Sequence, residues 1–176
     1  MRATRLTLAF HKSADPPPHS WWEARRSTGG RLTGGHMPIG RGIIPHDLVH
    51  LAAEAELGLS FGFWGLLAQG ATFRHGIDRR PTRPGRALIA AHRAGLAEAE
   101  ALANAHHHAW RTGQPTPLGP AFDRLAALWA AIPDGGTLTV EWPGLGLFDH
   151  SDPRSNDVPD TRRSSVRRSC RGSHRV

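Results

Sequence analysis

Two segments far apart in the chain alternate apolar and polar residues with the two-residue period of a β-strand. Thr4–His11 reads TRLTLAFH and Thr137–Trp142 reads TLTVEW. Such alternation places every second side chain in a core. The region between them has helical periodicity, so the chain must return to its first sheet after the helices. The pattern predicts an α+β fold, in which a small antiparallel sheet of N-terminal strands plus a C-terminal strand near residues 137–142 packs on three to four helices.

Turn-forming residues divide the N-terminal region into short strands. Trp21–Arg26 has β character and is followed by the turn sequence STGG at residues 27–30. Arg31–Thr33 is expected to return as a short third strand. The Gly-rich stretch Gly34–Gly42 is expected to be irregular.

Helices are expected where apolar residues recur at helical spacing between characteristic end residues. Pro45 suits the first turn of a helix because its missing N–H would have no partner there, and Gly58 suits a left-handed residue after the last turn. Ser60 is a candidate cap for a short, apolar second helix. The expected helices are Pro45–Leu57, Phe61–Gln69, about Gly85–Arg111 and Pro120–Ile132.

The net charge of +7 is concentrated at the C-terminal end of the chain. Residues 151–176 hold seven Arg and three Asp with almost no apolar residues, which predicts a disordered basic tail. Residues 1–150 are expected to form a single α+β domain. Because this domain is only mildly basic, its composition does not favour nucleic acid as a partner.

The apolar runs are short. The patch at Leu6–Phe10 is too short for the core of a signal peptide, and no run approaches the roughly 18 residues of a membrane-spanning helix. The single cysteine, Cys170, can form no disulfide within the chain and excludes a zinc site built from several cysteines. These features predict a cytoplasmic protein that does not act at a membrane.

The segment His46-Asp47-Leu48-Val49-His50 has the spacing of a metal-binding helix. Two histidines four residues apart lie on one helix face, about 6 Å apart along the axis, and both imidazoles can reach one ion. Zinc hydrolases use this spacing in HExxH, where the acid after the first histidine serves as general base. The sequence therefore predicts a divalent metal, zinc in the first place, held by His46 and His50, with Asp47 as a candidate catalytic acid.

Glu54 continues the same stripe and is the second candidate catalytic residue. A straight helix separates His46 from Glu54 by about 12 Å along its axis, so the two cannot bind the same ion. Either His46 and His50 or His50 and Glu54 therefore form the metal-binding pair. A catalytic zinc has three protein ligands as a rule, and another element must supply the third. Candidate third ligands are His75, Asp78, His92 and His106.

A second hypothesis needs no metal. Asp47 stabilises the positive end of the helix dipole, and His50 with Glu54 forms an ordinary pair one turn apart on a solvated helix face. The domain would then be a non-catalytic binding or regulatory module. The first hypothesis, in contrast, is a small metal-dependent enzyme with hydrolase-like activity.

The stretch IPHDLVHLAAEAELGLSFGFWGLLAQG, at residues 44–70, resembles a family of short, uncharacterised bacterial proteins. Members carry HDLVH, a Glu four residues later, and then GFWGLLA. A looser similarity in the order of elements extends to about Phe148. The resemblance implies no particular reaction.

His46, Asp47 and His50 are also similar to the HDxxH helix of coenzyme Q biosynthesis proteins. That pattern has a Glu twelve residues after the second histidine, and Gly62 occupies the position here. The HD phosphohydrolases use a His-Asp pair as well, with an upstream His and a downstream Asp; His36, Asp78 and Asp123 are the candidates for those positions.

Overall fold

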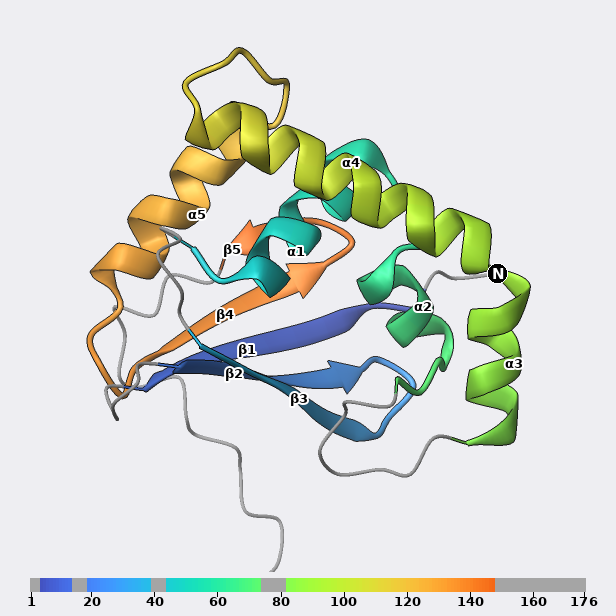
Figure 1. Cartoon of the computed structure of the whole chain (residues 1–176). Helices are drawn as coiled ribbons and strands as arrows, with labels where there is room; N and C mark the ends of the chain where they lie inside the picture. Colours follow the sequence, from blue (N-terminus) through green and yellow to red (C-terminus); the bar gives the residue numbers. More distant parts are fainter. Residues whose placement is uncertain (1–3, 14–18, 39–43, 74–81, 148–176) are drawn as a thin grey trace, which may run out of the picture.

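The computed structural model describes residues 4–13, 19–38, 44–73 and 82–147 (Figure 1). Five strands in this part of the chain form one antiparallel sheet with the order β3-β2-β1-β4-β5. They are β1 (Leu6–Ser13), β2 (His19–Arg26), β3 (Arg31–Pro38), β4 (Thr137–Trp142) and β5 (Gly146–Leu147). The predicted α+β class is confirmed. The expected tail, residues 151–176, lies outside the described residues.

The C-terminal strand joins the N-terminal ones, as its alternation predicts. β4 pairs with β1 so that Trp142 lies opposite Leu6 and Leu138 lies opposite Phe10. The large apolar side chains of both strands are buried, whereas Thr7 on the opposite face of β1 is exposed. The chain therefore returns to its N-terminal sheet after the helical region.

The third strand is longer than predicted. β3 runs through Pro38, so the expectation of irregular structure from Gly34 onward is wrong for residues 34–38, while residues 39–43 lie outside the described part. Gly34 lies against the indole of Trp22 on β2, and a Cβ at this position would overlap the ring. Here glycine permits a close approach inside a strand instead of ending it.

Five helices occur in the described residues, one more than the upper end of the prediction. α2 and α5 begin and end within two residues of the expected bounds. The helices are α1 (His46–Leu57), α2 (Phe63–Gln69), α3 (Arg83–Ala91), α4 (Arg93–Arg111) and α5 (Gly119–Ala131).

The extra helix arises because the expected helix Gly85–Arg111 is divided in two. The backbone leaves helical geometry at His92, with φ −111° and ψ 23°, although no Gly or Pro stands there. The His92 ring stacks on Phe61, with ring centroids 4.1 Å apart. α3 also begins earlier than expected, because the Thr82 side chain accepts a hydrogen bond from the Gly85 N–H.

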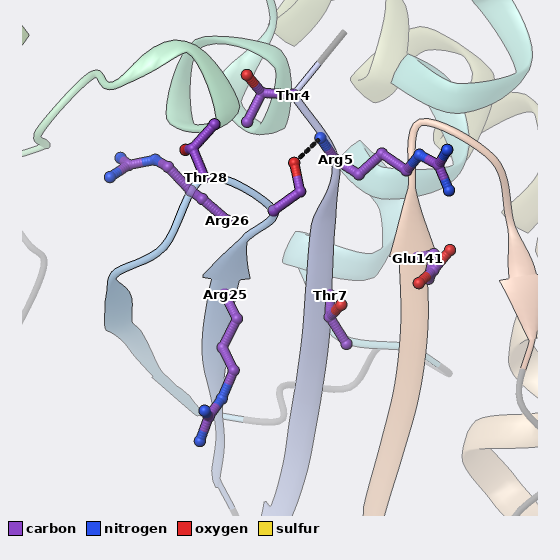
Figure 2. A pocket seen from close by; sticks show the side chains of 8 residues that line it. Thr4, Arg5, Thr7, Arg25, Arg26, Thr28 and Glu141 are labelled. Atoms are coloured by element: carbon purple, nitrogen blue, oxygen red, sulfur yellow. Dashed lines mark hydrogen bonds between the residues drawn. The ribbon is translucent and has the colours of Figure 1, made fainter. Parts of the chain in front are cut away.

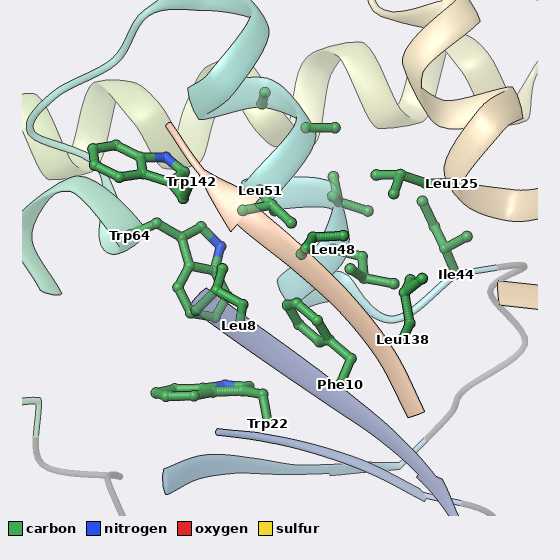
Figure 3. Close-up of a cluster of buried hydrophobic side chains, with 14 of the residues drawn as sticks. Leu8, Phe10, Trp22, Ile44, Leu48, Leu51, Trp64, Leu125, Leu138 and Trp142 are labelled. Atoms are coloured by element: carbon green, nitrogen blue, oxygen red, sulfur yellow. The ribbon is translucent and has the colours of Figure 1, made fainter. Parts of the chain in front are cut away.

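The helices lie on one face of the sheet, and α1 lies between the sheet and α4 (Figure 1). Figure 3 shows Leu48 and Leu51 of α1 above Leu8 and Phe10 of β1, and all four side chains are buried. Trp64 of α2 completes this layer. With both of its sides covered, α1 is the central helix of the described fold. That residues 1–150 form a single domain stays a prediction.

No helix in the described ranges is both long and apolar enough to cross a membrane. The predicted cytoplasmic location stays a prediction.

Candidate metal centre

The side of α1 that faces away from the sheet meets α4. Ala99 and Ala103 are the buried residues of α4, and Glu100 and Asn104 stand directly beside them on the same helix. Alanine allows two helix backbones to approach closely, because interaxial distance depends on the side chains at the contact. The short side chains thus bring Glu100 and Asn104 to the edge of α1.

Three residues converge at this contact. His46 and His50 of α1 and Glu100 of α4 each offer a ligand atom, and these atoms all lie within 4.8 Å of one another. Nε2 of His50 is 3.1 Å from Oε2 of Glu100. The two imidazole rings meet edge to face with centroids 4.6 Å apart. The predicted pairing of the two histidines on one face of the helix is therefore present, and the third member comes from α4.

Asn104 links two members of the cluster through hydrogen bonds of its side-chain amide. Its Nδ2 donates to Oε1 of Glu100 at 2.8 Å, and its Oδ1 lies 3.1 Å from Nε2 of His46. A carboxylate only accepts hydrogen bonds, so the amide nitrogen must face Glu100 and the amide oxygen must face His46. It follows that Nε2 of His46 carries the hydrogen.

The same reasoning fixes the hydrogen of His50. Nε2 of His50 faces the Glu100 carboxylate and must donate to it. Nδ1 of His50 is buried and has no hydrogen-bond partner among the described residues. Burial lowers the pKa of His50, the Glu100 charge raises it and His46 lowers it further, with a net lowering. A neutral imidazole is the form that binds a metal ion.

The cluster is buried on one side and open on the other. His50 is only 6% exposed, whereas the Glu100 side chain is 53% exposed. Two imidazoles and one carboxylate form the ligand set of several catalytic zinc sites, which keep a further position for water or substrate. The arrangement is chemically suited to such an open site.

Asp47 lies on a different side of α1. Its carboxylate accepts a hydrogen bond from the Trp22 side chain, and burial raises its pKa more than His46 and this hydrogen bond lower it. The backbone carbonyl of Asp47 accepts a hydrogen bond from the Trp64 indole at 3.1 Å. Asp47 is not among the three converging residues, and its catalytic role stays a prediction.

Glu54 is held at the start of α2. Its carboxylate accepts hydrogen bonds from the backbone N–H groups of Trp64, at 2.9 Å, and Gly65, at 3.0 Å. It is 1% exposed, and burial raises its pKa to about 7 despite these hydrogen bonds. The catalytic role of Glu54 stays a prediction.

The expectation that Ser60 caps α2 is wrong. Gly62 is the N-cap residue of this helix, and it has no side chain that could accept a hydrogen bond.

The idea that His50 and Glu54 form a pair on a solvated face is contradicted. Both residues are buried, because α2 covers Glu54 and α4 covers His50. The second hypothesis of the sequence analysis places this polar face of α1 in solvent. In the structure the polar face is a second packing surface.

The expected third ligands take other positions. His92 stacks on Phe61, and Nδ1 of His106 lies 2.9 Å from Oγ1 of Thr116. His75 and Asp78 lie outside the described residues.

Glu100 was missed because it looks like any other acid on an Ala-rich helix. The available signal was Glu100 and Asn104 one turn apart, each next to an alanine of the stripe Ala99 and Ala103.

A separate hollow of about 470 Å³ lies on the open face of the sheet. Arg5 and Arg25 are among the residues that line it, together with Glu141. Figure 2 shows the guanidinium groups of Arg5 and Arg25 directed away from each other. Arg26 also lines the hollow, but its guanidinium group donates hydrogen bonds to the backbone carbonyls of Leu67 and Ala71. Since the three cations do not converge, this hollow does not form a defined anion site.

No protein-family model, curated protein or solved structure matches the chain. The resemblance of residues 44–70 to a family of short bacterial proteins stays a prediction.

Proposed function

We propose that this domain binds one divalent metal ion between α1 and α4, through His46, His50 and Glu100. The observation that carries the proposal is the convergence of three ligand atoms within 4.8 Å, from residues on two different helices. The HDxxH spacing supplies the histidine pair, and the Ala99–Ala103 stripe brings the carboxylate to it.

Zinc is the ion that we assign to this site. Imidazole nitrogen and carboxylate oxygen are both good zinc ligands, and a His₂Glu set with an open position is typical of catalytic zinc. Iron(II) also binds two histidines and one carboxylate in open sites, so it is the principal competitor. The half-exposed Glu100 leaves room for an exchangeable ligand on the solvent side.

The reaction class that fits an open zinc site is hydrolysis. A zinc ion in such a site polarises a carbonyl or phosphoryl oxygen and makes water acidic enough to react near neutral pH. The residues of this chain would fix the ion and leave its solvent side accessible. We propose a hydrolase-like activity on an ester, amide or phosphoester.

A specific observation favours a second candidate, a binding or regulatory domain without metal. The contacts from His50 and Asn104 to Glu100, and from His46 to Asn104, form a continuous chain of polar contacts that needs no ion. Such a network would simply fasten α4 to α1. The two candidates differ in whether zinc displaces the hydrogen bond between His50 and Glu100.

Zinc titration by calorimetry separates the candidates. The purified chain, treated with chelator and then dialysed, should bind one zinc ion per chain, and His50→Ala and Glu100→Ala should abolish or greatly weaken binding. Glu98→Ala is the matched control, because Glu98 is an exposed acid on the same helix. An unmodified chain that binds no zinc, iron or manganese would end the metal proposal and leave the second candidate.

Hydrolysis is tested separately from binding. The zinc-loaded chain is assayed with chromogenic carboxylic esters, peptides, phosphate monoesters and phosphodiesters. Activity that disappears with chelator, returns with zinc and is lost in Glu100→Ala supports the hydrolase proposal. Stoichiometric zinc binding without activity on any class would restrict the proposal to metal binding.

A further inference from the structure

Asn104 occupies a special position in the cluster, because it contacts two of the three proposed ligands at once. Nδ2 donates to Oε1 of Glu100 at 2.8 Å, and Oδ1 accepts from Nε2 of His46 at 3.1 Å. Of the residues described, this is the one whose side chain links the carboxylate of α4 to the first histidine of α1.

Metal ligands are held in place by such partners as a rule. A ligating histidine usually donates its other ring N–H to an oxygen, which fixes both the tautomer and the ring orientation. Ligating carboxylates are in turn hydrogen-bonded. A single asparagine, with one acceptor and one donor, can meet both needs at the same time.

We propose that Asn104 is the positioning residue of the metal site, and that it makes Nδ1 of His46 the metal-binding nitrogen. This inference rests on the proposed function. Since Asn104 already takes the hydrogen on Nε2 of His46, the lone pair of a neutral ring lies on Nδ1. The same side chain occupies Oε1 of Glu100 and leaves Oε2, which faces His50, for the ion.

His50 must bind in the opposite way. Its Nδ1 is enclosed by the protein, so Nε2 is the nitrogen that faces Glu100 and the site. The ion therefore replaces the hydrogen that His50 now donates to Glu100, while the hydrogen bond from His46 to Asn104 remains. The two histidines of one motif are expected to bind through different ring nitrogens.

A substitution at residue 104 can test positioning of the ligands without disturbing the packing of α4. Asn104 is exposed, and its buried neighbour Ala103 makes the apolar contact of this turn. Removal of the amide should therefore leave the metal-free fold nearly unchanged. What it should change is the precision with which His46 and Glu100 are held.

The test compares the unmodified chain with Asn104→Ala, and Glu98→Ala is the control. We expect Asn104→Ala to weaken zinc binding by roughly 10- to 100-fold, the usual effect of losing such a partner. Stoichiometry should stay at one ion per chain. Glu98→Ala should bind like the unmodified chain, and the thermal midpoints of all three metal-free chains should agree closely.

Long-range ¹H–¹⁵N spectra of the histidine rings give a second readout. In the zinc-bound chain, His46 should show metal at Nδ1 and hydrogen at Nε2, whereas His50 should show metal at Nε2. Zinc on Nε2 of His46, or unchanged affinity in Asn104→Ala, would overturn the role of Asn104 while leaving the metal site intact. Failure of the unmodified chain to bind zinc would instead defeat the proposed function itself.

Discussion

Nε2 of His50 and Oε2 of Glu100 lie 3.1 Å apart across the contact between α1 and α4. The histidine is buried and the carboxylate is half exposed, so the pair is set at the boundary between the core and the solvent. One ligand of the proposed site is therefore held by the core, and a second is accessible to solvent. The pair also joins α1, which lies between the sheet and α4, to α4 on the outer side.

Zinc should stabilise the chain against heat only while Glu100 is present. A ligand that binds the folded state alone adds about 2.7 kcal/mol at one hundred times its dissociation constant. The thermal midpoint of the unmodified chain should therefore rise with zinc concentration, and that of Glu100→Ala should not. In the absence of zinc the two midpoints should be close, because an ion pair with an exposed partner contributes about 1 kcal/mol or less. An equal rise in both chains would place the bound zinc elsewhere.

The contact between α1 and α4 should tolerate no larger residue at position 103. Ala103 is fully buried, and overpacking of a core site costs about 1–3 kcal/mol. In Ala103→Leu we expect α4 to be displaced from α1, with lower stability in urea and weaker zinc binding. Ala105→Leu is the matched control because Ala105 is exposed on the same helix. Tight zinc binding by Ala103→Leu would show that the close helix approach is not needed.

Glu54 should make the chain less stable as pH rises from about 4.5 to about 7. The ordinary pKa of a glutamate, 4.5, applies to the unfolded chain, and the pKa of Glu54 is about 7 in the folded chain. Between these values the folded chain retains a proton that the unfolded chain releases. Stability falls with pH wherever the folded state binds more protons. The raised pKa corresponds to about 3 kcal/mol in the free energy of unfolding. This stabilisation is fully present below pH 4.5 and is lost as the pH rises to about 7. Urea unfolding across this range, in the unmodified chain and in Glu54→Gln, measures the effect. The same slope in both chains would assign it to another group.

Gly62 should be required for the burial of Glu54. A Cβ on residue 62 would overlap the Glu54 carboxyl group, which is fixed by the N–H groups of α2. Gly62→Ala should therefore cost about 1–3 kcal/mol in urea unfolding. Gly119→Ala is the control, since a Cβ there makes an ordinary contact with Thr116 at 3.7 Å. Equal stability of the two variants would contradict the close packing at Gly62.

The sequence predicted the sheet well because its signals are local. Alternation in Leu6–Phe10 and Thr137–Trp142 marks the buried face of each strand, and burial on one face is what defines a strand register. The extension of β3 was missed because Gly34 looks like a turn residue. Its actual role, to make room for Trp22, depends on a neighbouring strand that the local sequence does not specify.

The site was predicted only as far as one helix reaches. The spacing of His46 and His50 follows from helix geometry alone. The sequence cannot distinguish Glu100 from Glu98, because only the packing of α4 across α1 brings Glu100 to the histidines. The position of Glu54 also depends on tertiary packing, since its partners are N–H groups of α2, ten residues later in the chain.

The most direct test is to locate the ion itself. Crystals of the full chain grown with zinc, measured above and below the zinc absorption edge, should show one anomalous peak between α1 and α4. We expect bonds of about 2.0–2.2 Å from this peak to His46, His50 and Glu100. An empty contact with the network of Glu100 and Asn104 intact, or a zinc ion held by other residues, would contradict it.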